Sequence, residues 1–169
     1  DNTVTIGNTA ATTSALANIN AGSATAAVSI GQNVDLVANA SITTGTGNDT
    51  VNIDILTEGT TSVDMGEKAS DSDLLNLFGA NNMGLTVVNL TATDQVSQLN
   101  GSNNSESQTG IESVDASGLS GSFGVNITGS SDANVLTGTG NADNFTGGEG
   151  GDTIEGGAGN DTIGLAEST

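Results

Sequence analysis

Residues Gly147–Glu155 and Gly156–Gly164 read GGEGGDTIE and GGAGNDTIG, two consecutive copies of one nine-residue unit. Two looser copies precede them in the same register, GSSDANVLT at Gly129–Thr137 and GTGNADNFT at Gly138–Thr146. Each unit opens with glycine and has a polar residue at its sixth position and a large apolar residue at its eighth. The sixth positions hold Asn134, Asp143, Asp152 and Asp161, and the eighth positions hold Leu136, Phe145, Ile154 and Ile163. A flexible glycine-rich linker has no reason to keep an apolar residue at every ninth position, so the repeat predicts a regular fold.

The nine-residue period fits a turn of about six residues followed by a strand of about three, and it fits neither a helix nor a plain hairpin. Glycines at the first, second and fourth positions allow positive φ and close backbone approach in the turn. Alternate strand residues point to opposite faces, so Phe145, Ile154 and Ile163 would stack inward as a thin core. Two units complete one coil, which places Asp143 near Asp161 and Asn134 near Asp152. The predicted fold is therefore all-β, a parallel β-roll or β-helix with Gly-Asp turns.

Carboxylates brought together by stacked turns repel one another unless a cation lies between them. A carboxylate with several backbone carbonyl oxygens is a ligand set suited to Ca²⁺. The unit resembles the RTX, or hemolysin-type, calcium-binding repeat GGxGxDxUx, which forms a parallel β-helix. The resemblance covers residues 129–164 and implies that turn carbonyls and the aspartates bind calcium between stacked turns, although Asp132, Asn134 and Asn141 depart from the consensus. The ligands it implies are Asp143, Asp152, Asp161, Asn134, Gly147, Gly148, Gly150, Gly156, Gly157 and Gly159.

The same turn chemistry occurs earlier in the chain. Thr44–Asn52 reads TGTGNDTVN, with Gly47, Asp49 and Val51 at the fourth, sixth and eighth positions. The acidic segment Val63–Leu77 follows, and stacked on Asp49 it would bring Asp71 and Asp73 into a second oxygen-rich cluster. The alternative is a solvated acidic loop. Strand and acidic-loop arrangements of this kind resemble those of RTX-containing bacterial surface-layer proteins and adhesins.

Three segments are expected along the chain: an N-terminal β segment at 1–43, a β-helical region with the acidic loop at 44–110, and the RTX β-roll at 111–169. Thr12–Ile19 fits either a short helix or another strand, and whether residues 1–43 join the same coil is left open. The most apolar segments, Leu74–Phe78 and Leu85–Leu90, are expected to form the main core. Asn100–Gly110 is expected to be a polar loop, followed by a strand that starts near Gly110 and has Ile111 and Val114 inward.

Composition restricts the partners. The 169 residues include 20 acids and one basic residue, Lys68, for a net charge of −19. This charge opposes binding to nucleic acid or to anionic membranes, and it makes stability dependent on bound cations. Lys68 is expected to pair with the acids around it. No apolar run is long enough to span a membrane, so no membrane insertion is expected.

Catalysis is not expected. The chain has no His and no Cys, which excludes triads, His-based zinc sites and thiol chemistry. The absence of Trp and Tyr argues against a carboxylate-based glycosidase. No conventional signal peptide stands at the N-terminus, so a mature or otherwise exported chain is expected.

The function expected is that of a secreted calcium-binding structural protein, extracellular or at the bacterial cell surface, that folds on Ca²⁺ and self-assembles into a filament or surface layer. Asp1–Ile6 resembles the second half of the early repeat at Asn48–Ile53, which favours head-to-tail stacking of copies into a homopolymer through strand edges. The repeats end with Leu165–Thr169, without the further secretion segment that RTX export modules carry. The alternatives are a calcium-triggered RTX export and folding module, or an adhesin segment excised from a larger secreted protein.

Overall fold

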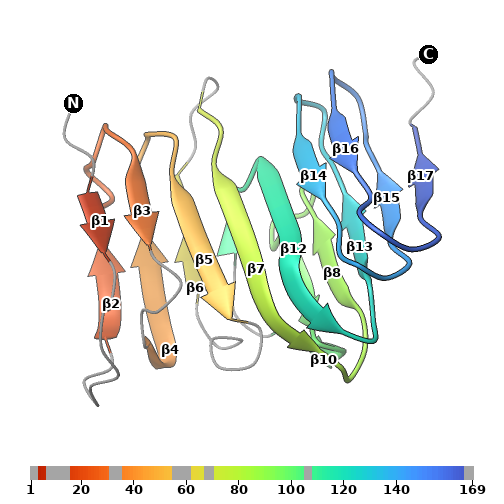
Figure 1. Cartoon of the computed structure of the whole chain (residues 1–169). Helices are drawn as coiled ribbons and strands as arrows, with labels where there is room; N and C mark the ends of the chain where they lie inside the picture. The colour runs from red at the N-terminus through yellow and green to blue at the C-terminus, as the bar shows by residue number, and fades with distance from the viewer. Residues whose placement is uncertain are drawn as a thin grey trace.

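The computed structural model describes residues 4–6, 16–30, 36–54, 62–66, 71–104 and 108–165. These residues form β-strands and turns, with no helix among them. The chain runs back and forth between two sheet layers, so that successive coils stack along one axis (Figure 1). The predicted all-β, parallel coiled fold is confirmed.

The front layer is one continuous parallel sheet of seven strands. It runs from the N-terminal strands at one end of the molecule to the repeat strands at the other (Figure 1). It therefore crosses both boundaries expected at residues 43 and 110. In spatial order its strands are β1 (Val4–Ile6), β3 (Val28–Ile30), β5 (Thr50–Asp54), β7 (Leu74–Asn81), β12 (Ser113–Gly121), β14 (Val135–Thr137) and β16 (Thr153–Glu155).

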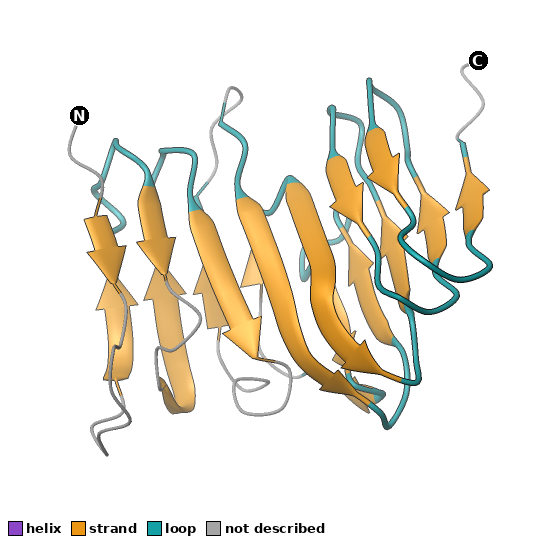
Figure 2. Ribbon diagram, in the orientation of Figure 1, coloured by secondary structure: helices purple, strands orange, loops and turns teal. Residues whose placement is uncertain are grey.

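The opposite layer is divided into two sheets (Figure 2). The N-terminal one is parallel and contains β11 (Gln108–Thr109), β6 (Ser62–Asp64), β4 (Leu36–Thr43) and β2 (Leu16–Asn20). The C-terminal one is parallel over β8 (Thr86–Asn89), β13 (Val125–Thr128), β15 (Asn144–Thr146) and β17 (Thr162–Gly164), and it gains β9 (Val96–Leu99) and β10 (Ser102–Asn103) as antiparallel neighbours of β8.

Coil length changes along the molecule. In the repeats, residues 18 positions apart lie above one another, as Asn134 and Asp152 do. The earlier coils contain 21 residues between Val28 and Asp49 and 24 between Asp49 and Asp73. The next one, from Asp73 to Glu112, contains 39 because it includes β9, β10 and β11.

The core is a narrow stack of inward side chains between the layers. Val51, Leu75, Val114 and Leu136 of the front sheet are at most 1% exposed and follow one another along the axis. In the repeats Leu136 and Phe145 are buried, Ile154 is partly buried against the core, and Ile163 is 49% exposed because β17 is the last strand of its sheet. The inward direction predicted for Phe145 is thus confirmed, while Ile163 lies at an uncovered end of the described coil.

Other expectations have mixed outcomes. Leu75, Leu77, Val88, Leu90, Ile111 and Val114 are buried, as predicted for the central segments. The segment Asn100–Gly110, predicted to be a polar loop, contains the short strands β10 and β11. The prediction of a loop was wrong for the residues in these strands. Leu16–Asn20 is a strand, so the later part of Thr12–Ile19 is a strand and not a helix. Residues 12–15 and Lys68 lie outside the described residues. Within the described part, no helix has the length and apolar character to cross a bilayer.

Candidate calcium-binding turns

The turns of successive coils stack in two rows. We call the first edge the row of turns that lead into the seven-stranded sheet, at residues 44–49, 71–73, 110–112, 129–134 and 147–152. The second edge is the row that leads into the sheet of β13, β15 and β17, with turns at 138–143 and 156–161. The repeat aspartates therefore fall alternately on the two edges.

On the first edge, an acidic or amide side chain just before each strand bonds to the backbone of the coil before it. Asp49 Oδ1 accepts from the N–H of Val28 at 2.7 Å, and Asp73 Oδ1 accepts from the N–H of Asp49 at 2.7 Å. Glu112 Oε2 accepts from the N–H of Asp73 at 2.7 Å. Further along, Asp152 Oδ1 accepts from the N–H of Asn134 at 3.1 Å. This ladder of side chains holds the coils in register, and it includes Glu112, which the sequence reading missed because its turn contains no nine-residue unit.

The second edge repeats the pattern. Asp143 Oδ1 accepts from the N–H of Val125 at 2.8 Å, and Asp161 Oδ1 accepts from the N–H of Asp143 at 3.0 Å. The predicted proximity of Asp143 to Asp161 and of Asn134 to Asp152 is therefore confirmed. Aspartate at the sixth position has a structural role here, whether or not an ion is also bound.

The two turns with the full consensus hold their carboxylates inside. A Cβ placed on Gly147 would lie 2.6 Å from Asp152 Oδ2, and one placed on Gly156 would lie 2.4 Å from Asp161 Oδ2. Gly148 adopts a φ of 95° and lies directly against the carbonyl oxygen of Ser130 in the coil below. The carboxylates of Asp152 and Asp161 each accept a single hydrogen bond from the described residues, through Oδ1. The second oxygen of each remains available to a cation.

The two degenerate turns satisfy their sixth-position side chains internally. Asp143 accepts hydrogen bonds from the N–H of Thr139 at 2.7 Å and from its hydroxyl at 3.0 Å, and it is 3% exposed. Asn134 accepts from the N–H of Ser130 at 2.7 Å and donates to the carbonyl of Glu112 at 2.8 Å. The hydroxyl of a residue at the second position is a donor that Gly148 and Gly157 lack. The ligand roles predicted for Asn134 and Asp143 stay predictions, and these two side chains already have protein partners.

The donor set of the full-consensus turns fits calcium. It consists of carboxylate and backbone carbonyl oxygens, which Ca²⁺ accepts in flexible geometry. Among the described residues, no three acidic side chains form a ready-made metal centre, so an ion at these turns would take much of its coordination from the backbone. Asp152 and Asp161 would each supply the carboxylate of one turn, and Gly147–Gly150 and Gly156–Gly159 the neighbouring carbonyls.

The earlier cluster is more deeply buried. Asp49 is 1% exposed and Asp73 is 0% exposed, and the Oδ2 atom of each has no hydrogen-bond partner. Both carboxylate oxygens of Asp71 are also buried without a partner. Burial raises the pKa of Asp73 to about 8 from an ordinary 3.8, and the nearby carboxylates of Glu112, Asp49 and Asp71 add to the rise against the opposing N–H of Asp49. The structure therefore brings Asp49, Asp71 and Asp73 together, as predicted, and Gly47 packs on the backbone of Ala26 beside them.

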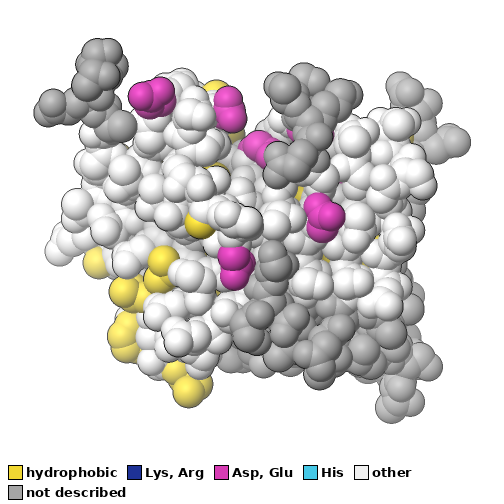
Figure 3. All heavy atoms as spheres, turned by 180° about the vertical axis from the view of Figure 1, so that it is seen from behind, with side chains coloured by type: hydrophobic (Ala, Val, Ile, Leu, Met, Phe, Trp, Pro, Cys, Tyr) yellow, Lys and Arg dark blue, Asp and Glu magenta, His cyan; other side chains and the backbone are white. Residues whose placement is uncertain are grey.

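The charged side chains on the described surface are acidic. The face shown in Figure 3 carries several Asp and Glu side chains and no Lys or Arg among the residues drawn in colour. Since the only basic residue of the chain, Lys68, lies outside the described residues, none of the described acids pairs with a lysine or arginine within the described part.

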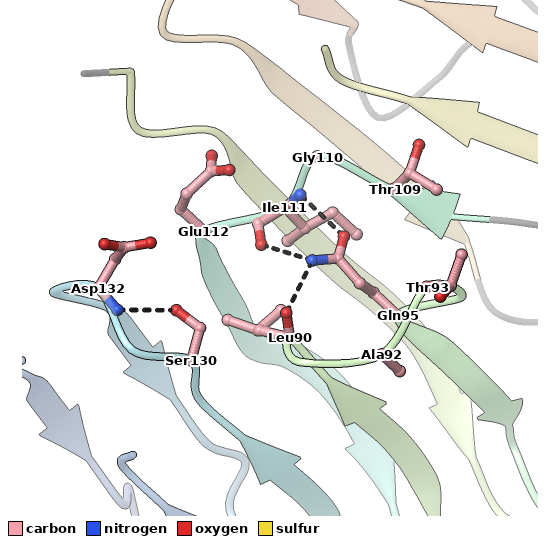
Figure 4. Close-up of a pocket in the computed structure, with 10 residues that line it drawn as sticks. All are labelled: Leu90, Ala92, Thr93, Gln95, Thr109, Gly110, Ile111, Glu112, Ser130 and Asp132. Atoms are coloured by element: carbon pink, nitrogen blue, oxygen red, sulfur yellow. Dashed lines mark hydrogen bonds between the residues drawn. The ribbon is translucent and has the colours of Figure 1, made fainter. Parts of the chain in front are cut away.

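A cleft of about 280 Å³ lies where the strands β9–β11 rejoin the coil (Figure 4). Gln95 forms its inner wall: its amide donates to the carbonyls of Leu90 and Ile111 and accepts from the N–H of Ile111 at 2.9 Å. Through these hydrogen bonds, the Gln95 side chain connects the segment that contains β9–β11 to the start of β12. The cleft is lined by Leu90, Ala92, Thr93, Gln95, Thr109, Gly110, Ile111, Glu112, Ser130 and Asp132.

Stacked Gly-Asp turns on a parallel two-layer coil define a calcium-binding β-roll. Residues 128–163 match the family model of the RTX calcium-binding nonapeptide repeat, in four copies. These residues are thus RTX nonapeptide repeats, and RTX nonapeptide repeats bind calcium. No curated protein and no solved structure matches the chain.

Proposed function

We propose that this chain is a calcium-stabilised structural segment of a secreted protein, in which Ca²⁺ holds the stacked coils together. The observation that carries the proposal is the pair of full-consensus turns. Asp152 and Asp161 point into their own turns, bond to the coil below with one oxygen, and have no basic side chain near them in the described part. RTX repeat proteins are typically secreted, which makes an extracellular location plausible.

Thermal unfolding of the full chain tests this function. Calcium at about 1,000 times its dissociation constant should stabilise the fold by about 4 kcal/mol if one ion binds only the native state, and by more if several do. Magnesium at the same concentration is the control, because it demands a more regular octahedral shell and should stabilise much less. Equal melting temperatures in calcium, magnesium and chelator would contradict the proposal.

We further propose that the ends of the coil associate with a second copy of the chain. Among the described strands, the outermost ones, β16 and β17, each have one neighbour in their sheets, and Ile163 and Leu165 near this end are 49% and 77% exposed. Unpaired parallel strands with exposed apolar residues are templates for a further coil. A contact between the last coil of one copy and the first coil of the next is heterologous and yields open fibres.

Light scattering of the full chain, with calcium added and then chelated, tests self-assembly. Scattering that grows in calcium and reverses on chelation is expected. An Ile163→Asp variant should fold yet remain monomeric, because its charge would lie at the joint. A wild-type chain that stays monomeric in millimolar calcium would contradict assembly and leave the calcium-binding role intact.

A further inference from the structure

The turns before β5 and β7 lie outside the residues matched by the RTX repeat, yet they are fixed side by side. The N–H of Asp49 donates to Asp73 Oδ1 at 2.7 Å, and the N–H of Leu74 donates to the carbonyl of Asp49 at 2.9 Å. One residue earlier, the N–H of Ser72 donates to Asn48 Oδ1 at 3.2 Å. Backbone and side chains together therefore hold the two acidic turns in one arrangement.

This arrangement leaves carboxylate oxygens stranded inside the protein. Asp49 and Asp73 are at most 1% exposed, and each uses Oδ1 for the ladder while its Oδ2 has no partner. The two oxygens of Asp71 are likewise buried and without a partner. A buried carboxylate oxygen without a donor is costly, and the cost rises when like charges are adjacent. The fold would not keep such a cluster unless something compensates it.

Within the described part of the chain, a proton and a metal ion are the two available compensators. One proton on Asp73 neutralises one carboxyl and leaves the unpartnered oxygens of Asp49 and Asp71 without a donor. A divalent cation interacts with several carboxylate oxygens at once. The cluster offers only oxygen atoms, and hard cations with flexible coordination prefer such sites, which points to Ca²⁺ over zinc or copper.

We propose that a calcium ion binds between the turns before β5 and β7, with Oδ2 of Asp49 and Oδ2 of Asp73 as its principal side-chain ligands and the carboxylate of Asp71 beside them. Since no three acidic side chains form a ready-made centre here, carbonyl oxygens or water complete the shell. The site rests on the same calcium-binding role as the repeats, but it would link coils of 24 residues that lie outside the matched repeats. Calcium would then stabilise the middle of the solenoid as well as its C-terminal end.

Equilibrium dialysis against radioactive calcium, in buffer with physiological salt and excess magnesium, tests the site in the full chain. The double variant Asp49→Asn/Asp73→Asn should bind one ion fewer than the wild type. The variant Asp152→Asn/Asp161→Asn should lose the ions of the repeats and still melt at a higher temperature in calcium than in chelator. Equal stoichiometry and affinity in the wild type and the Asp49/Asp73 variant would overturn the site.

A third variant covers the case in which the Asp49/Asp73 variant does not fold. Asp71 accepts no hydrogen bond from the described residues, so Asp71→Asn preserves the ladder. Because it removes the charge of one ligand, it should lower the affinity for one calcium ion by roughly tenfold. The matched control is Asp94→Asn, which removes the same charge where Oδ1 accepts from the N–H of Gln108, and it should leave calcium binding unchanged. Unchanged affinity in Asp71→Asn overturns the site. A wild-type chain that binds no calcium overturns the proposed function as well.

Discussion

At the scale of single residues, the second position of each nine-residue unit distinguishes two kinds of turn. Ser130 and Thr139 donate backbone and hydroxyl hydrogens to the sixth-position side chain of their own turn. Gly148 and Gly157 adopt φ of 95° and 90° and have no hydroxyl. The sixth-position side chain is therefore a hydrogen-bonded cap in the first two units and has an available carboxylate oxygen in the last two.

This difference predicts different effects for substitutions of the repeat aspartates. Asp152→Ala or Asp161→Ala should move the calcium-induced folding transition to higher calcium, because each removes a carboxylate suited to binding the ion. Asp143→Ala should destabilise the protein by about 1–3 kcal/mol at saturating calcium, because it strands buried donors. Denaturant unfolding at several calcium concentrations separates the two cases. Identical calcium dependence in Asp152→Ala and the wild type would contradict the assignment.

The glycines of the turns make a second prediction. Gly148→Ala combines a positive φ with a clash against the carbonyl oxygen of Ser130, and it should cost more than about 1 kcal/mol of unfolding free energy. Gly140→Ala is the matched control, since its Cβ would meet nothing within 4 Å. That control should be neutral or stabilising by up to about 1 kcal/mol. Equal unfolding midpoints for the two variants would show that the stacking of Gly148 does not matter.

At the scale of elements, the nine-residue period determined what could be predicted. It located the strands β14, β15, β16 and β17 and the pairing of coils 18 residues apart, because turn and strand have fixed lengths there. The earlier coils of 21 and 24 residues have no constant period, so their pairing could not be derived from spacing. The strands β9–β11 were missed because two of them contain only two residues and lie in a polar, low-complexity stretch.

The turn before β7 predicts a pH dependence. With calcium removed, the pKa of Asp73 is about 8 in the folded protein, against about 3.8 when unfolded. Between these values the folded protein holds a proton that the unfolded chain has released, so stability should fall as pH rises from about 4 to about 8. The β content of calcium-depleted protein, measured by far-UV circular dichroism at pH 5 and pH 8, checks this, and it should be higher at pH 5. Asp73→Asn should show a smaller change with pH than the wild type, because it removes the proton on Asp73 and leaves only the general charge repulsion that both proteins share. An equal pH dependence in the two proteins would contradict the origin in Asp73.

At the scale of the whole molecule, the chain carries a net charge of −19 and forms a coil only two sheet layers thick. The core is a single narrow stack of side chains, while acidic turns accumulate along the edges. Self-repulsion of this size opposes compaction, and cations bound between coils offset it. Because the binding energy of such ions is also folding energy, the calcium-free chain should be largely unfolded.

Far-UV circular dichroism of the full chain against calcium concentration tests that claim most directly. We expect a disordered spectrum in chelator and a cooperative change to a β spectrum, with a midpoint on the order of 10⁻⁴–10⁻³ M calcium, as for extracellular calcium modules. Full β content in chelator, unchanged on adding calcium, would contradict the account.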